Sequence, residues 1–381
     1  MVPHVSYKLF RLNWSEQLAT NKNQHFVPRC YLKPFSNNGE GKAIRVFNLD
    51  REQIIENAAV KHQCSGSYFY GENERLETAI QSIEQKYAGA LLRVRSPSYN
   101  DFLVKDELIL KRFWLLQYLR TEAASKRAVE MSNDLVKLAG AGYDFNLEIR
   151  DAVQMAMHAF ANEMRVIDDL KVCLIKNATS FPFVTSDDPA VFNNKWFKSD
   201  RRHLGSGFGL RSSGVLAFLP LCENTMFIAY DSDVYSIPKN SGIIKIKREE
   251  DVYALNQLQF LNSRANVFPG QRYSRKLLCD AYRSCEENRL NVRHAFHYAV
   301  FDGVEKGQKR YRVVGEHEHE GHQEILVHSQ NLFPSPKSWP ILLQWRKKGF
   351  GMTNGTGVGC IRRTCIDSLS EQPFEKMYTG R

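Results

Sequence analysis

The sequence predicts an α+β fold in which a helical half of three long helices packs with a smaller, antiparallel, β-rich half. Two patterns support this class: apolar residues recur every three or four positions over much of residues 74–177, and short apolar runs broken by turn residues follow residue 181. The composition agrees, since 43% hydrophobic and 25% charged residues are typical of globular proteins and exclude disordered, collagen-like and coiled-coil chains. With 381 residues the chain can bury a large core.

We expect one main α+β domain at residues 22–335. Residues 1–21 show no strong periodicity and are expected to form an N-terminal extension. Residues 336–381 are expected to form a basic, Gly-rich C-terminal tail, because residues 337–381 hold eight Lys or Arg against three Asp or Glu.

The first long helix is expected from residue 74. Its apolar stripe steps by three and four and comprises Leu76, Ile80, Ile83, Tyr87, Leu91 and Val94. At about 100° per residue, Glu77 and Glu84 fall within about 20° of each other at the edge of this stripe. Both carboxylates therefore flank a buried seam on one side of the helix.

The second helix is expected over residues 105–138, and its stretch at 113–120 is apolar almost all round, as in a central, buried helix. Gln117 and Arg120 share a face inside that stretch, and a polar pair buried there needs partners. A third, amphipathic helix near residues 147–177 completes the helical half.

The β-rich half begins near Phe181, where a short apolar strand meets a turn sequence, Ser186-Asp187-Asp188-Pro189, that ends it. Paired strands are expected at 215–220 and 225–230, helices at 249–266 and 274–289, and shorter strands near 299–302 and 311–314. An earlier strand is expected at 43–48.

Several classes of protein are disfavoured. The eight cysteines include no close CxxC pair, so we expect reduced thiols and no structural zinc. No run reaches the roughly 20 apolar residues of a membrane helix, and the first residues do not resemble a signal peptide, so a cytoplasmic protein without membrane contact is expected. Residues 205–209 do not fit GxGxxG and no P-loop lysine follows, so no nucleotide cofactor motif is present.

The charge balance favours anionic partners. The chain has 52 basic and 42 acidic residues, a net charge of +10, and nucleic acid is the partner that such a balance suits best. Basic stretches contain Trp196, Phe197, Phe208 and Tyr311, aromatic side chains on which bases could stack. A solvated basic face is the alternative explanation.

Several motifs together resemble the domain of unknown function 4238 family, over roughly residues 22–270. They are Gln24-His25-Phe26-Val27-Pro28-Arg29-Cys30-Tyr31-Leu32-Lys33-Pro34-Phe35, Glu77 with Ile83-Glu84, Gln117-Tyr118-Leu119-Arg120-Thr121, Ser186-Asp187-Asp188-Pro189 and Leu255-Asn256-Gln257. Cys30 stands where the family usually has an aromatic residue. The resemblance implies a domain and no assigned activity.

The polar residues of these motifs suggest a metal-assisted phosphodiesterase, such as a nuclease that acts as a bacterial toxin or defence effector. Carboxylates with a histidine suit Mg²⁺ or Mn²⁺, arginines can clamp a phosphate, and the pKa of histidine lies near the working pH. We expect a catalytic set of His25, Asp187 and Asp188, metal ligands at Glu77, Glu84 and Asp187, and substrate contacts from Arg29, Arg120, Gln117 and Asn256.

A structural role for the same residues is the alternative. Buried Arg–Glu pairs and amide networks tie helices together in many proteins, and Asp187 and Asp188 before Pro189 could simply organise a turn. The protein would then be a non-enzymatic module that binds nucleic acid or protein. The sequence leaves open whether the protein is an enzyme.

Overall fold

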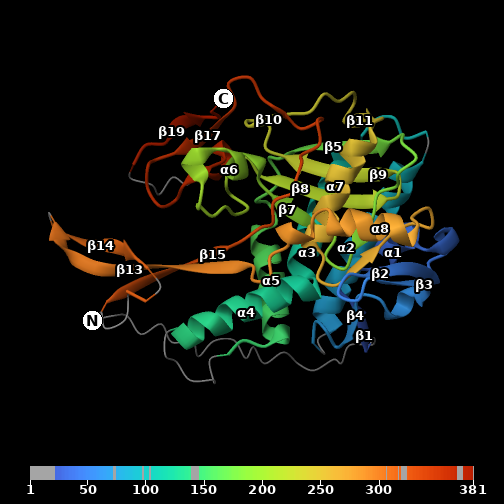
Figure 1. Cartoon of the computed structure of the whole chain (residues 1–381), viewed down its shortest axis with the longest axis horizontal. Helices are drawn as coiled ribbons and strands as arrows, with labels where there is room; N and C mark the ends of the chain where they lie inside the picture. Colours follow the sequence, from blue (N-terminus) through green and yellow to red (C-terminus); the bar gives the residue numbers. More distant parts are fainter. Residues whose placement is uncertain are drawn as a thin grey trace.

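The computed structural model (Figure 1) describes residues 22–71, 74–96, 98–102, 104–138, 146–305, 307–315, 317–318, 324–366 and 372–380. The expected N-terminal extension, residues 1–21, lies outside these ranges. Long helices and mainly antiparallel sheets confirm the α+β class. Across the described residues, no helix is both long and apolar enough to cross a membrane.

The helical half consists of α2 (Glu74–Arg95), α3 (Val104–Arg120), α4 (Glu122–Leu138) and α5 (Ile149–Glu163). The expected helix over 105–138 is divided at Thr121, whose Oγ1 accepts the backbone N–H of Ala124 (3.1 Å) and so begins α4. The third expected helix ends at Glu163, and the apolar run 172–175 lies in a buried strand, β5 (Lys171–Asn177). Such a short apolar run fits a buried helix or a buried strand equally well, which is why periodicity alone misassigned it.

A five-stranded sheet forms the middle layer, in the order β11-β5-β9-β8-β7. Its strands are β5 (Lys171–Asn177), β7 (Val191–Asn193), β8 (Leu216–Cys222), β9 (Thr225–Tyr230) and β11 (Ile243–Ile246). All its pairs are antiparallel except β11 with β5. Both faces are buried, because alternate residues of β5 enter different cores: Val172 and Leu174 face the helical half, and Cys173 and Ile175 face the other side.

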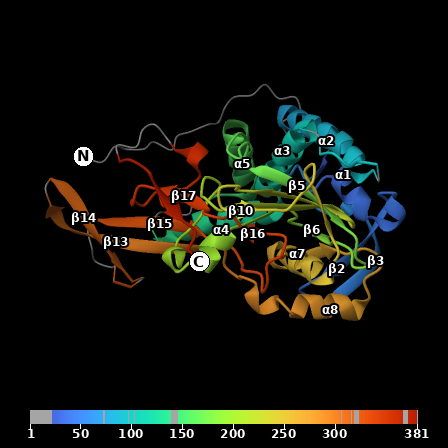
Figure 2. The same ribbon diagram turned by 90° about the horizontal axis from the view of Figure 1, so that it is seen from above.

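The other side of this sheet is covered by α7 (Glu249–Asn262) and α8 (Arg275–Arg283), as Figure 2 shows. A four-stranded antiparallel sheet adjoins them, in the order β3-β2-β12-β6. Its strands are β2 (Ala43–Asn48), β3 (Gln53–Ala59), β6 (Thr185–Ser186) and β12 (Asn266–Phe268). The helix α3 is central: Trp114 is buried and its Nε1 donates to the carbonyl of Phe218 in β8 (3.1 Å).

Short elements form the region of the motif at residues 24–35. The strand β1 (Asn23–His25) pairs with β4 (Ser65–Ser67), and α1 (Arg29–Leu32) follows β1 directly. A further short helix, α6 (Lys195–Ser199), lies between β7 and β8 in the chain.

A three-stranded arm of β13 (His294–Glu305), β14 (Gln308–Val314) and β15 (Ile325–Asn331) extends away from these layers (Figures 1 and 2). Within the expected tail, β16 (Gln344–Trp345) pairs with β10 (Tyr235–Ser236), and β17 (Phe350–Thr353), β18 (Cys360–Ile361) and β19 (Glu375–Tyr378) form a small sheet. The buried Arg362 anchors this segment, since its Nε lies 2.8 Å from Asp169 Oδ2.

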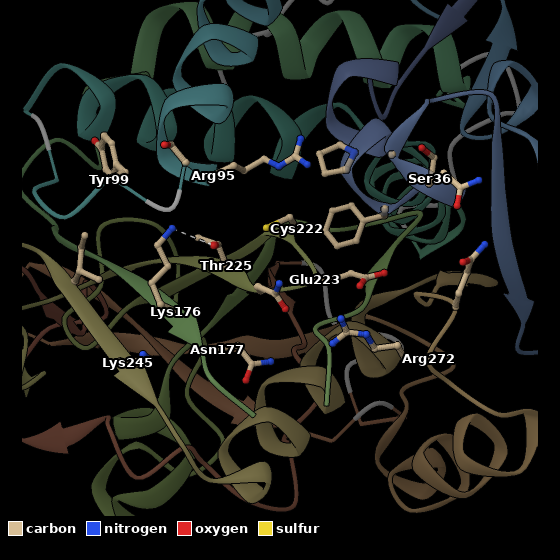
Figure 3. A pocket seen from close by; sticks show the side chains of 18 of the residues that line it. Ser36, Arg95, Tyr99, Lys176, Asn177, Cys222, Glu223, Thr225, Lys245 and Arg272 are labelled. Carbon is tan, nitrogen blue, oxygen red and sulfur yellow. Dashed lines mark hydrogen bonds between the residues drawn. The ribbon is translucent and has the colours of Figure 1, made fainter. Parts of the chain in front are cut away.

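A hollow of about 790 Å³ lies where the end of α2 meets β5, the turn between β8 and β9, and the loop before α8 (Figure 3). Its walls therefore come from both halves of the fold.

Candidate functional site

The structure divides the expected site residues between two places. One group surrounds β1 and α2 and comprises His25, Arg29, Glu77, Glu84, Gln117 and Arg120. The other lies around β6 and α7 and comprises Asp187, Asp188 and Asn256. The helix break at Thr121 connects them, because Thr121 follows Arg120 in the chain and binds Asp188.

The first group surrounds a pocket of about 580 Å³, which we call the α2 pocket. One wall comes from β1 and the turn into α1, with His25 and Arg29, and the facing wall comes from α2, with Glu77 and Glu84. Lys61 and Tyr70 also line it. The periodicity that places both glutamates at the edge of the apolar stripe therefore also places them in one pocket wall.

The backbone around His25 is held by polar side chains on one side. Gln24 is buried, its Oε1 accepts the N–H of Tyr70 (2.7 Å), and its Nε2 donates to the carbonyl of Gly71 (3.1 Å). The Tyr70 hydroxyl in turn donates to the carbonyl of His25 (3.1 Å). These bonds fix β1 to the loop that precedes α2.

On the other side, Arg120 connects α3 to both α2 and β1. Its side chain has no exposed surface, and its Nη1 donates to Glu84 Oε1 (2.7 Å). Its Nε and Nη2 donate to Gln117 Oε1 (3.2 and 3.1 Å), and Gln117 Nε2 donates to the carbonyl of Phe26 (2.7 Å). Both Gln117 and Arg120 are thus fully engaged inside the protein and lie behind the pocket wall.

His25 is half-buried in the wall of the α2 pocket, and its Nε2 is buried without a hydrogen-bond partner among the described residues. Burial lowers the pKa of His25, the positive charges of Arg29 and Arg120 lower it further, and nearby backbone groups of Lys61 and Val60 act in the opposite direction. The lowered pKa favours the neutral imidazole, which is the form that can accept a proton. A buried polar atom without a hydrogen-bond partner lowers the free energy of unfolding by about 1–3 kcal/mol. A bound group that forms a hydrogen bond with Nε2 would recover this energy.

The acidic side chains of the pocket already have partners. Glu77 Oε1 accepts from Gln81 Nε2 (3.2 Å), and Glu84 Oε1 accepts from Arg120. Within the part of the chain that the structure describes, no three His, Cys, Asp or Glu side chains converge as a metal site.

Cys30 also lines the α2 pocket. Burial raises the pKa of its thiol to about 12, and the Glu84 carboxylate adds to the rise while Arg120 opposes it. The thiol is therefore protonated at neutral pH, and it lacks the thiolate that nucleophilic catalysis needs.

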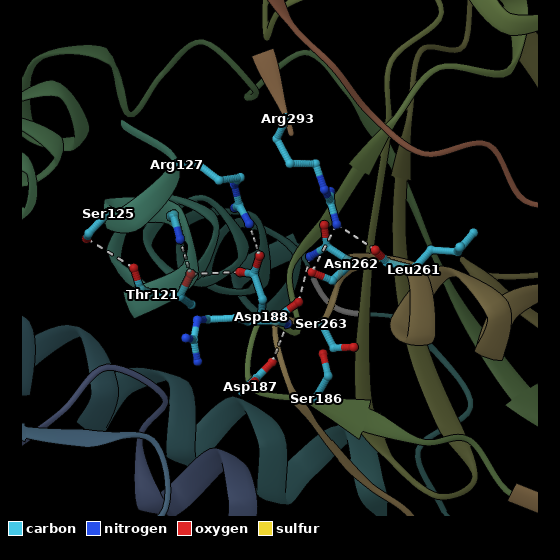
Figure 4. A network of polar contacts seen from close by, with 12 residues as sticks. Thr121, Ser125, Arg127, Ser186, Asp187, Asp188, Leu261, Asn262, Ser263 and Arg293 are labelled. Atoms are coloured by element: carbon cyan, nitrogen blue, oxygen red, sulfur yellow. Dashed lines mark hydrogen bonds and ion pairs between the residues drawn. The ribbon is translucent and has the colours of Figure 1, made fainter. Parts of the chain in front are cut away.

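Asp188 forms the centre of the second group (Figure 4). Its side chain has no exposed surface, its Oδ1 accepts from the Thr121 hydroxyl (2.7 Å) and its Oδ2 accepts from Arg127 Nη1 (2.7 Å). Its backbone carbonyl accepts from Asn262 Nδ2 (2.6 Å). We call this set the Asp188 network. It ties α4 to the end of α7.

In the described part of the chain, the carboxylate of Asp187 is bonded by backbone groups. Its carboxylate accepts the N–H groups of Arg264, Ala265 and Asn266 at 2.8, 3.0 and 2.9 Å, and so holds the chain entering β12. Burial raises the pKa of Asp187 to about 6, and these three bonds act in the opposite direction. Such an arrangement is typical of a carboxylate that organises a turn.

Asn256 is likewise engaged with internal groups. Its Oδ1 accepts the N–H of Val184 (3.1 Å), and its Nδ2 donates to the carbonyl of Pro182 (3.0 Å) and to the Tyr273 hydroxyl (2.8 Å). These bonds fasten α7 to the segment before β6.

Sequence reasoning did not assign Gln24, Lys61, Tyr70, Thr121 or Arg127 to a site. Gln24 and Thr121 stand in the family motifs, so the motifs gave a signal for them. Tyr70 and Arg127 act through partners 45 and 61 residues away, and no local pattern indicates them.

The family model described as "Protein of unknown function (DUF4238)" matches residues 23–272 and confirms the resemblance seen in the motifs. No curated protein and no solved structure matches the chain. The matched region contains the whole α2 pocket and the residues that bond to Asp187 and Asp188.

Proposed function

We propose that this chain, which belongs to the DUF4238 family, is a phosphodiesterase that cleaves nucleic acid in the α2 pocket. The observation that carries the proposal is the imidazole of His25, whose Nε2 has no hydrogen-bond partner among the described residues, in a pocket that also holds Arg29 and Lys61. The lowered pKa of His25 favours the neutral form. A proton acceptor beside cations is what attack on a phosphate requires. The net charge of +10 favours a polyanionic substrate.

In the proposed reaction, the oxygen of a water molecule attacks phosphorus while the His25 imidazole accepts the water proton. The bond between phosphorus and the leaving nucleoside oxygen breaks, and the imidazolium returns the proton to that oxygen. Arg29 and Lys61 bind the phosphoryl oxygens, on which negative charge grows in the transition state. Histidine acting as base contributes about 10²–10⁴-fold to such rates.

Gln117, Arg120 and Tyr70 act in this proposal as positioning residues. Gln117 bonds the carbonyl after His25, Tyr70 bonds the carbonyl of His25 itself, and Arg120 holds Gln117. Their bonds support a fixed imidazole orientation, which proton transfer needs.

The metal expected from sequence, Mg²⁺ or Mn²⁺, enters no step of this reaction. Glu77 and Glu84 each give one oxygen to a protein donor, and no third acidic or imidazole ligand joins them among the described residues. The experiment below therefore compares cleavage with Mg²⁺, with Mn²⁺ and with EDTA.

A binding module without catalysis is the second candidate. The Asp188 network favours this candidate, because the polar contacts of Asp188 are made with other protein groups and so stabilise the fold. In this alternative the bonds of Arg120 have the same structural role.

The test incubates the purified full chain with end-labelled single-stranded DNA, double-stranded DNA, bulk RNA and tRNA. Each substrate is tested with Mg²⁺, with Mn²⁺ and with EDTA. The proposal predicts shorter products from at least one substrate, with the products lost in His25→Asn and reduced in Arg29→Ala. Salt-dependent binding of the same nucleic acids without any product would favour the binding module.

A further inference from the structure

The larger hollow of Figure 3, which we call the basic cavity, lies apart from the α2 pocket residues used above. Among the residues that the structure describes, four cationic side chains line it, and Glu223 is the single carboxylate in the lining. The cations are Arg95 at the end of α2, Lys176 in β5, Lys245 in β11 and Arg272 before α8. They therefore come from both halves of the fold.

Three of these cations have no fixed partner. Arg95, Lys245 and Arg272 are exposed, and in the described ranges none of them forms an ion pair or a side-chain hydrogen bond with another residue. Arg272 acts on Glu223 only through its charge, which lowers a pKa that burial raises. The positive charge of the cavity is thus largely uncompensated by the protein.

Lys176 gives the cavity a fixed cation. It is half-buried, and its Nζ donates to the carbonyl of Val94 (2.5 Å) and lies 3.3 Å from Thr225 Oγ1. Both acceptors are neutral, so neither of them is a counter-ion for the lysine. In Figure 3 Arg95 reaches over the hollow from the helical side, and Arg272 lies on the opposite side.

We propose that the basic cavity binds a compact diphosphate group, as found in inorganic pyrophosphate and in nucleoside diphosphates. The volume of about 790 Å³ lies within the range of small-ligand sites. The four cations line the same hollow, so several of them can contact one compact polyphosphate at the same time. The inference uses no residue of the α2 pocket and needs no cleavage activity, so the two proposals fail separately.

Isothermal titration of the full chain with inorganic pyrophosphate, ADP and adenosine tests this inference. Pyrophosphate and ADP should bind, and adenosine should not. The double variant Arg95→Ala/Lys245→Ala should raise Kd about tenfold or more, since hydrogen bonds to charged groups are the strong ones. The matched control Lys171→Ala/Lys247→Ala removes the same charge from exposed positions outside the cavity and should change Kd less than about twofold.

Cys222 provides a local readout, because it is half-buried and lines the cavity, whereas Cys365 is half-buried and does not. Bound pyrophosphate should slow alkylation of Cys222 by iodoacetamide and leave Cys365 unchanged, as measured on peptides by mass spectrometry. The inference is overturned if pyrophosphate and ADP fail to bind, if adenosine binds alone, or if both double variants bind equally. It is also overturned if a DNA oligonucleotide protects Cys222 and pyrophosphate does not.

Discussion

Replacement of Arg120 by Met tests the connection between α2, α3 and β1 most severely. The change keeps a long, unbranched side chain and removes three donor groups. Glu84 loses its partner at 2.7 Å, and the buried Gln117 Oε1 loses donors at 3.2 and 3.1 Å. Gln117 then loses the support that holds it against the carbonyl of Phe26.

Removing one partner of a buried ion pair costs about 3–5 kcal/mol. The Glu84 side chain is 23% exposed, so water can partly solvate its charge, and we expect the lower end of that range, about 3 kcal/mol. The entropy of unfolding is about 2.1 cal/mol/K per residue, or about 0.8 kcal/mol/K for 381 residues. The Tm of Arg120→Met should therefore fall by about 4 °C.

Thermal unfolding followed by circular dichroism measures this shift. The matched control is Arg310→Met, because Arg310 pairs with Glu305 on the surface, where both side chains are more than half exposed. Such a pair contributes about 0–1 kcal/mol, so its Tm should fall by about 1 °C or less. Equal Tm values for the two variants would refute the fastening role of Arg120.

Three further outcomes are expected. The folded-state pKa of His25 is lowered from 6.5, so the contribution of His25 to stability is present above that pH and is lost as the pH falls. The Tm of wild type, measured relative to the Tm of His25→Asn, should therefore drop between about pH 7.5 and about pH 5.5. A Tm difference that stays constant over this range would contradict the lowered pKa. Asp187→Asn places an amide against three backbone N–H donors and should lower Tm by about 3 °C while the cleavage rate per folded molecule is unchanged; a stable but inactive variant would return Asp187 to the catalytic set. Thr121→Val removes the cap at Ala124 and a donor to Asp188, so the free energy of unfolding in urea should fall by about 2–3 kcal/mol, and an unchanged value would contradict the cap.

Local patterns predicted much of the fold correctly. The stripe of the first helix is confirmed, since Ile80, Tyr87, Leu91 and Val94 are buried in α2. The strands expected at 43–48 and 225–230 coincide with β2 and β9. These elements are decided by side chains close in sequence, which is the information that periodicity contains.

The helix break at Thr121 could not be read from the same patterns, because apolar residues continue on both sides of it. Thr121 caps α4 there, and its hydroxyl also donates to Asp188, a partner 67 residues away. The split of the expected site has the same origin: Asp187 is engaged by the backbone of residues 264–266, which only the folded chain brings near. Motif membership identified polar residues, and the fold decided which of them face a pocket.

The rate of phosphodiester cleavage by His25→Asn, relative to wild type, tests the central proposal most directly. His62→Asn is the matched control, because His62 is an exposed histidine that does not line the α2 pocket. With the substrate that wild type cleaves best, we expect His25→Asn to lose about 10²-fold or more and His62→Asn to stay within about twofold of wild type. Cleavage by His25→Asn at the wild-type rate, with its fold intact by circular dichroism, would contradict the proposal that His25 is the proton acceptor.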